Sequence, residues 1–132
     1  MDIKYLQIVA AALTIEIINV LVLVILGSAF RPEEAGQSQA LLQNFGHSLG
    51  PVVGVLLCFI GSYLFTRTMT HSKIPNGVLL GLLVAIIEMG ILLGNDADFQ
   101  IVFMVSNTGR VIAGALGAYL ADSYSRQDKH DV

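Results

Sequence analysis

The sequence predicts an all-α integral membrane protein, in which four transmembrane helices form an up-down bundle with both termini in the cytoplasm. Of its 132 residues, 55% are hydrophobic and only 13% are charged, whereas about 25% of the residues in soluble domains are charged. The apolar residues gather into four runs, each long enough to cross the roughly 30 Å hydrocarbon core of a bilayer. We therefore predict a single membrane domain, 1–132, with helices at about 5–30, 48–70, 76–94 and 99–122, a polar outer loop at 31–47 and a polar tail at 123–132.

The first run, 5–30, is interpreted as a retained transmembrane helix. It exceeds the roughly 7–15 apolar residues of a signal peptide, and Glu16 lies inside it. A cleaved signal peptide is the alternative, because Lys4 precedes the run and small residues follow it at 27–29. Within the run, Glu16 and Asn19 are three residues apart, so they share one face of the helix.

The connection 31–47 is polar and contains the start signal of a short helix. Pro32 is followed by two glutamates, and this order suits the first turn of a helix, where proline is tolerated and acids favour the positive end of the dipole. Gly36 and Gly46 argue against a long helix. We expect a short interfacial helix here.

The second run, 48–70, carries a small residue at every fourth position, and Pro51 is expected in its first turn, where proline is tolerated. Helices in lipid associate through close packing, which small residues allow. The alternative is that glycine and other small residues are simply common in membrane helices. The third and fourth runs repeat the spacing of four, and the predicted packing residues are Gly50, Gly54, Cys58, Gly81 and Gly114.

The fourth run, 99–122, follows a tight turn at 95–98 in which Asp98 is suited to cap the helix. Its apolar residues recur on one face that is expected to meet lipid: Ile101, Val105, Ile112, Leu116 and Leu120. Arg110 lies near the middle of the run, where a charge costs about 2.5–3.5 kcal/mol on insertion scales, so it should face the bundle interior and find a partner.

The basic residues predict the orientation. Four crossings place Lys4, Arg67, Lys73, Arg126 and Lys129 on one side and only Arg31 on the other. Lysine and arginine near short loops stay in the cytoplasm, so both termini are predicted to be cytoplasmic. The compactness and short loops favour a multi-pass protein of a cell membrane, with the prokaryotic inner membrane as the expected location.

Glu16, Glu88 and Arg110 form the predicted intramembrane charged cluster. Counted from the cytoplasmic helix ends, all three lie about 11 or 12 residues deep, which places them near one level at 1.5 Å per residue. Two carboxylates and one guanidinium leave one excess negative charge, which proton uptake by one glutamate would relieve in a low-dielectric site. Asn19, Ser62 and Asn107 are expected to supply supporting hydrogen bonds.

Two functions fit this pattern. One is a proton-coupled transporter or channel-like protein that acts as an oligomer, because so small a bundle needs further copies to enclose a path. The other is an accessory or assembly subunit that docks onto a larger membrane-protein partner and uses the ion pairs only to fix helix register. A lipid- or quinone-associated enzyme component is a weaker third reading, since the sequence contains no evident redox ligand.

The central glutamate of the first run is similar to that of the small multidrug-resistance transporters. The chain departs from that family in Arg110, in its long first loop and in its lack of tryptophan, so membership is not inferred. No enzyme is expected, because no nucleophile has a histidine at a matching depth. His47, His71 and His130 fall in separate loops, and we expect no metal site, no cofactor and, without a basic run, no nucleic-acid partner.

Overall fold

The computed structural model describes residues 3–29, 38–94 and 101–127, with side chains described from residue 48 onward in the second range. The described residues form four helices, each with a segment long and apolar enough to cross a membrane. The predicted all-α four-helix membrane fold is confirmed. The helices are α1 (Tyr5–Ala29), α2 (Ser38–Arg67), α3 (Lys73–Gly94) and α4 (Ile101–Gln127).

The start of α2 corrects the predicted outer loop. The helix begins at Ser38 rather than at residue 48, so residues 38–47 are the start of α2 and not a loop with a separate short helix. Pro51 consequently lies inside the helix instead of in its first turn. Because proline has no N–H, it cannot donate to the carbonyl of residue 47, and the α2 ladder lacks one hydrogen bond there. The predicted helix start at Pro32 and the turn at 95–98 lie outside the described residues.

The end of α4 corrects the predicted polar tail. The helix continues to Gln127, because the polar residues of its last turns make bonds within the helix. The Ser123 hydroxyl donates to the Tyr119 carbonyl, and Arg126 pairs with Asp122 at 2.9 Å, one turn earlier. Such i,i+4 pairs stabilise helices modestly.

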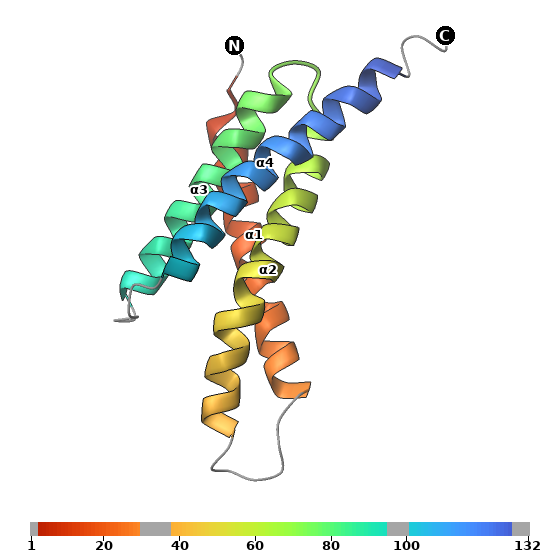
Figure 1. The fold of residues 1–132 in the computed structure, drawn as a ribbon. Coiled ribbons are helices and arrows are strands. Elements are labelled where there is room, and N and C mark those ends of the chain that lie inside the picture. The colour runs from red at the N-terminus through yellow and green to blue at the C-terminus, as the bar shows by residue number, and fades with distance from the viewer. Residues whose placement is uncertain (1–2, 30–37, 95–100, 128–132) are drawn as a thin grey trace.

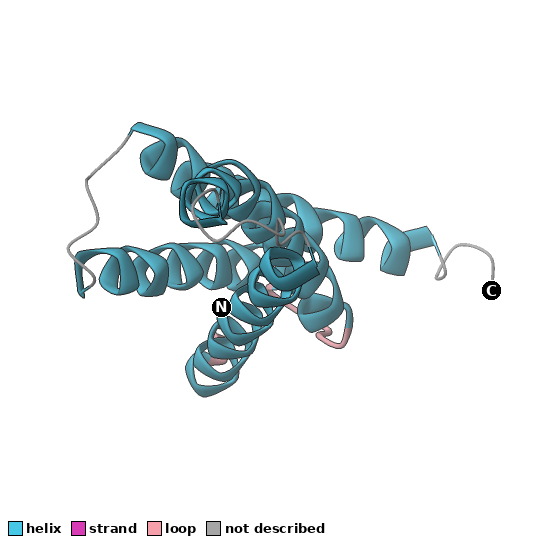
Figure 2. Cartoon of the chain, turned by 90° about the horizontal axis from the view of Figure 1, so that it is seen from below, coloured by secondary structure: helices cyan, strands magenta, loops and turns pink. Residues whose placement is uncertain are grey.

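Successive helices run in opposite directions, so the start of α1, the α2–α3 connection and the end of α4 lie at one end of the molecule, which we call the basic end (Figure 1). α4 packs against α2 and α3, and α1 packs against the other side of the same two helices. Within the described residues α1 and α4 do not pack against each other. The α1–α2 and α3–α4 pairs diverge toward the end opposite the basic end (Figure 1), and the helices cross rather than run parallel (Figure 2).

Small residues bring α4 close to the backbones of α2 and α3. A Cβ atom added at Gly81 would lie 2.6 Å from the Arg110 carbonyl oxygen, and one at Gly114 would lie 2.5 Å from the Gly77 carbonyl oxygen. On the other side of α4, the Ser62 hydroxyl of α2 donates to the Gly114 carbonyl at 2.6 Å. Backbone approach of this kind is how helices associate in lipid, where burial of apolar surface gives little driving force.

The outward faces of the helices are apolar. On α4, the residues predicted to meet lipid are all exposed in the isolated chain. Large apolar side chains are exposed on α1, α2 and α3 as well, among them Leu6, Ile17, Leu56, Leu64 and Ile86. Because exposed apolar surface of this extent is unfavourable in water, these faces contact the hydrocarbon of a bilayer.

Hydrogen bonds join the helices at the basic end. Asn76 of α3 is fully buried, and its side-chain oxygen accepts from the backbone N–H of Lys4 at 3.2 Å. The Lys73 ammonium is also buried and donates to the Ala121 carbonyl at 3.1 Å and to the Ser125 hydroxyl at 2.8 Å. The basic end is therefore fixed by specific polar contacts, whereas the helix pairs separate at the other end.

The close contact between α3 and α4 predicts different effects of one methyl group at two glycines of α3. Gly81→Ala should destabilise the fold by about 1–3 kcal/mol, because the added Cβ meets the α4 backbone, which cannot move aside as a side chain can. Gly90→Ala is the matched control, since nothing lies within 4 Å of a Cβ there. Unfolding midpoints in a denaturing-detergent titration measure both, and equal tolerance of the two substitutions would contradict the close contact.

The charge distribution predicts the orientation of the chain, which cysteine labelling can measure. Ser28, near the end of α1, and His71, in the α2–α3 connection, are exposed at opposite ends. In a Cys58→Ser background, Ser28→Cys should react with a membrane-impermeant maleimide in intact cells, and His71→Cys only after permeabilisation. The reverse pattern would place the basic end outside.

Candidate functional site

Arg110 lies at the centre of the candidate site. Its side chain is completely buried, and its two terminal nitrogens each donate to a different glutamate. Nη1 lies 2.6 Å from Glu16 Oε1 of α1, and Nη2 lies 2.6 Å from Glu88 Oε1 of α3. The predicted association of these three charges is therefore present, and three helices contribute one charged residue each.

The guanidinium connects two helices whose backbones do not pack against each other in the described part of the chain. α1 and α4 have no backbone packing in the described part of the chain, so the Arg110 side chain passes between α2 and α3 to reach Glu16. A glycine on α2 makes room for it: a Cβ added at Gly54 would lie 2.8 Å from Cζ and 2.9 Å from Nε of Arg110. Gly54, predicted as a packing residue, therefore accommodates the arginine head group.

The cluster lies on the side of the helix crossing away from the basic end. Side chains on a helix lean toward its N-terminus, and α4 begins at the end where the helix pairs diverge. The Arg110 backbone carbonyl faces Gly81, whereas its head group contacts Glu88, which is seven residues, or about 10 Å, further along α3. An apolar core that includes Ile8, Ala12 and Leu80 fills the side toward the basic end.

Several buried polar atoms around the cluster have no hydrogen-bond partner among the described residues. They include Glu88 Oε2, Asn19 Oδ1, both amide atoms of Asn107 and Arg110 Nε. Glu16 and Asn19 lie one turn apart on α1, and Asn107 and Arg110 lie one turn apart on α4. Native proteins leave few buried polar groups unsatisfied, so their grouping around these two ion pairs marks this region as the candidate functional site.

The predicted supporting residues divide between two roles. The expectation that Ser62 hydrogen bonds to the charges is wrong, because its hydroxyl donates to the Gly114 carbonyl and serves helix packing. Asn19 and Asn107 are buried one turn from members of the cluster, but Asn19 Oδ1 and both amide atoms of Asn107 have no hydrogen-bond partner among the described residues. Cys58 is fully buried, and its thiol contacts the Arg110 carbonyl at 3.3 Å. Gly50 is buried with room for a methyl group, 3.7 Å from Leu23.

The buried side chains of Lys73 and Asn76 were not predicted from the sequence. Lys73 follows a short connection between two apolar runs, a position that is typical of a solvated lysine at a membrane surface. Nothing in its sequence neighbourhood indicates that it donates to the end of α4 instead. Both residues stabilise the basic end and lie away from the charged cluster.

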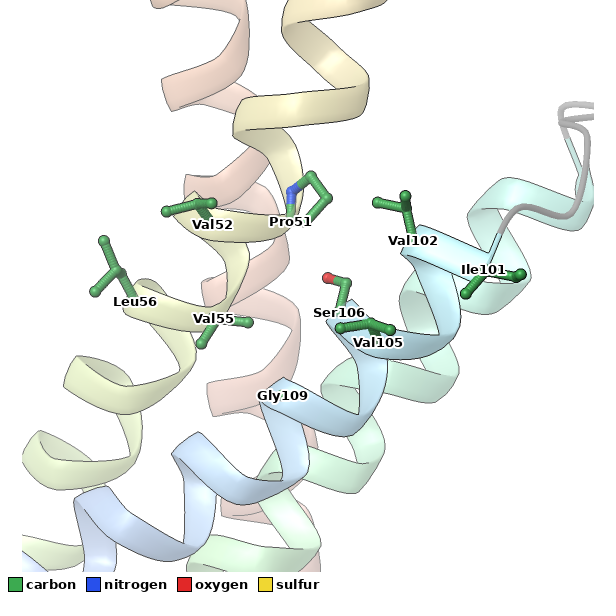
Figure 3. Close-up of a pocket in the computed structure, with 9 residues that line it drawn as sticks. All are labelled: Pro51, Val52, Val55, Leu56, Ile101, Val102, Val105, Ser106 and Gly109. Carbon is green, nitrogen blue, oxygen red and sulfur yellow. The ribbon is translucent and has the colours of Figure 1, made fainter.

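Two apolar hollows lie beside the helices near the cluster. The larger, of about 490 Å³, is a groove between α2 and α4 whose walls include Pro51, Val55 and Val102 (Figure 3). Ser106 also lines it, and its hydroxyl is buried without a partner among the described residues. The second, of about 380 Å³, lies along α3 and includes Asn107 in its wall.

Comparison of this chain with protein families, with characterised proteins and with solved structures finds no match. The function is therefore inferred from the site itself.

The shared guanidinium predicts strong energetic coupling between Arg110 and each glutamate. Arg110→Leu alone should cost about 3–5 kcal/mol, because it leaves buried carboxylates uncompensated. Adding Glu16→Leu or Glu88→Leu should recover part of that loss. The coupling should be at least as large at Glu16, whose side chain is 6% exposed, as at Glu88, which is 15% exposed.

Double-mutant cycles read from the folded fraction after heating in mild detergent give these coupling energies. Met104→Leu is the control for substitution on α4, because Met104 is exposed on the outer face. Strictly additive losses for both glutamates would mean that neither carboxylate stabilises Arg110.

Proposed function

We propose that this protein is a small transport protein of a cell membrane, in which the Glu16–Arg110–Glu88 cluster binds and releases a proton. The observation that carries the proposal is the charge ratio at a fully buried arginine: two carboxylates contact one guanidinium. One negative charge is left over in a low-dielectric environment, where an uncompensated charge is expensive. Binding of a proton removes that charge, and its release restores it.

Glu88 is the better candidate for the proton. Its Oε1 atom accepts from Arg110, while its Oε2 atom is buried without a partner among the described residues. Its side chain is also the more exposed of the two carboxylates. A proton on Oε2 would leave the contact with Arg110 in place, so protonation does not require the cluster to come apart. Glu16, which is nearly enclosed, then remains the permanent counter-ion.

The proposed transporter acts as an oligomer. Leu80 and Val84 are completely buried in the apolar core between the cluster and the basic end. A polar path through the centre of one chain would have to cross this core. A path at an interface between copies avoids it, and the apolar outer faces and the groove between α2 and α4 offer surfaces for such an interface.

The groove between α2 and α4 favours one alternative, an accessory subunit of a larger membrane complex. Helices that pack in a membrane bury apolar side chains against small residues, and the groove presents Gly109 among apolar side chains. In that case the cluster only fixes the arrangement of the helices. Native mass spectrometry after gentle purification separates the two functions, since a subunit retains a different protein in fixed stoichiometry and a transporter retains only its own copies.

The transport proposal predicts proton uptake that depends on Glu88. Infrared difference spectra recorded across a pH titration should show a protonated-carboxyl band, and Glu88→Gln should remove it because glutamine has no titrating proton. In liposomes with a pH gradient, the wild-type protein should carry a proton flux that Glu88→Gln abolishes. Thr14→Val is the control, since Thr14 is exposed on α1 and its hydroxyl bonds only to its own helix.

Two results would contradict this function. One is a titration without any carboxyl band that Glu88→Gln removes. The other is flux through Glu88→Gln equal to that through Thr14→Val and the wild-type protein.

A further inference from the structure

A third apolar hollow, of about 180 Å³, lies between α1 and α3 and begins at the basic end, and we call it the α1–α3 groove. Its walls include Tyr5 and Val9 of α1 and Leu79, Leu82 and Ile86 of α3. Leu79 and Ile86 are seven residues apart, so the groove extends about 10 Å along α3. Val9, Leu82 and Ile86 are exposed in the isolated chain, so the groove opens toward lipid and not toward the charged cluster.

A positive charge lies at the end of this groove. Lys4 directly precedes Tyr5, its side chain is exposed, and it makes no ion pair within the described residues. Its backbone is fixed, because its N–H donates to the side-chain oxygen of the fully buried Asn76 at 3.2 Å. α1 begins here, so the positive end of its helix dipole adds to the charge of the lysine.

We propose that the α1–α3 groove binds an anionic phospholipid, with one acyl chain along the groove and the headgroup at Lys4. The groove walls are apolar and suit a hydrocarbon chain, whose transfer between apolar surroundings costs little. The lysine complements a net negative headgroup, since basic residues near a membrane surface attract anionic lipids. This binding goes beyond the proposed proton site and does not depend on it.

The size of the groove favours a lipid chain over a second copy of the protein. A transmembrane helix with its side chains is about 10–12 Å across, and this width does not fit into about 180 Å³. Tyr5 is 69% exposed at the same end, where a phenol is typical of a membrane interface and its O–H can donate to a phosphate oxygen. A zwitterionic lipid offers the same chains and phosphate, so the charge of Lys4 is what selects the anionic one.

The test uses a single tryptophan, because the chain contains none. Leu82→Trp places an indole at the groove in the full-length protein, reconstituted into vesicles of equal parts phosphatidylcholine and phosphatidylglycerol. Bromine atoms on the chains of one lipid or the other quench the indole fluorescence. The relative binding constant should favour phosphatidylglycerol about fivefold, which corresponds to about 1 kcal/mol for one lysine near an anionic surface. Ile60→Trp, exposed on α2, is the control and should be quenched nearly equally by both lipids.

Removal of one charge at a time separates the proposed site from the general charge of the basic end. In the Leu82→Trp protein, Lys4→Gln should bring the ratio of the two binding constants close to one. Arg67→Gln is the matched control, because Arg67 is also exposed at the basic end but contributes nothing to the groove walls, and the preference should persist. Native mass spectrometry of the wild-type protein from an equal mixture of both lipids requires no variant and should show retained phosphatidylglycerol.

Three results would overturn the lipid site. Equal quenching of Leu82→Trp by both lipids, together with no preferential retention by the wild-type protein, would show that the groove does not select charge. Equal loss of preference in Lys4→Gln and Arg67→Gln would assign the effect to the basic end as a whole. Quenching of Ile60→Trp but not of Leu82→Trp would mean that a second copy or another protein covers the groove.

Discussion

The charge on Arg110 is the constraint on which the arrangement of the helices depends. A buried guanidinium is tolerated only with compensation, and its two carboxylates lie on α1 and α3. The backbones of α1 and α4 do not pack against each other in the described part of the chain, and the Arg110–Glu16 ion pair joins the two helices directly. The ion pairs therefore fix the position of α1, the helix with the least support from backbone packing.

Small residues make this arrangement possible. Gly54 leaves room for the guanidinium, and Gly81 and Gly114 let α3 and α4 approach backbone to backbone. The Ser62 hydroxyl bonds to the Gly114 carbonyl, so one residue of α4 contacts both neighbouring helices. Close approach at the crossing brings the three charged residues within reach of one another, although they belong to helices that diverge beyond it. The helix packing and the polar site therefore both follow from the same crossing of the helices.

The sequence was sufficient to predict the helices and the pairing of the charges, since length, apolarity and the cost of an isolated charge in lipid are local or general properties. It was insufficient for residues 38–47, which are helical despite their polar composition. It was also insufficient for the end of α4, where polar side chains bond within the helix. The misassignment of Ser62 and the unpredicted contacts of Lys73 have a related reason. A hydroxyl or an ammonium can donate to any nearby carbonyl, and which carbonyl is nearby depends on the crossing of the helices.

The proposed proton site gives the second carboxylate a role that neutralising Arg110 alone does not require. A single glutamate would neutralise Arg110 and hold α4 to α1 or to α3, whereas the second carboxylate adds a negative charge whose burial is unfavourable unless something offsets it. Its Oε2 atom is also buried without a partner among the described residues. In the proposed function a proton offsets this charge, and the same ion pairs then both position the helices and take part in proton binding. A site of this kind couples its occupancy to the packing of α1, because any change in charge at Glu88 alters how strongly Arg110 is held to Glu16.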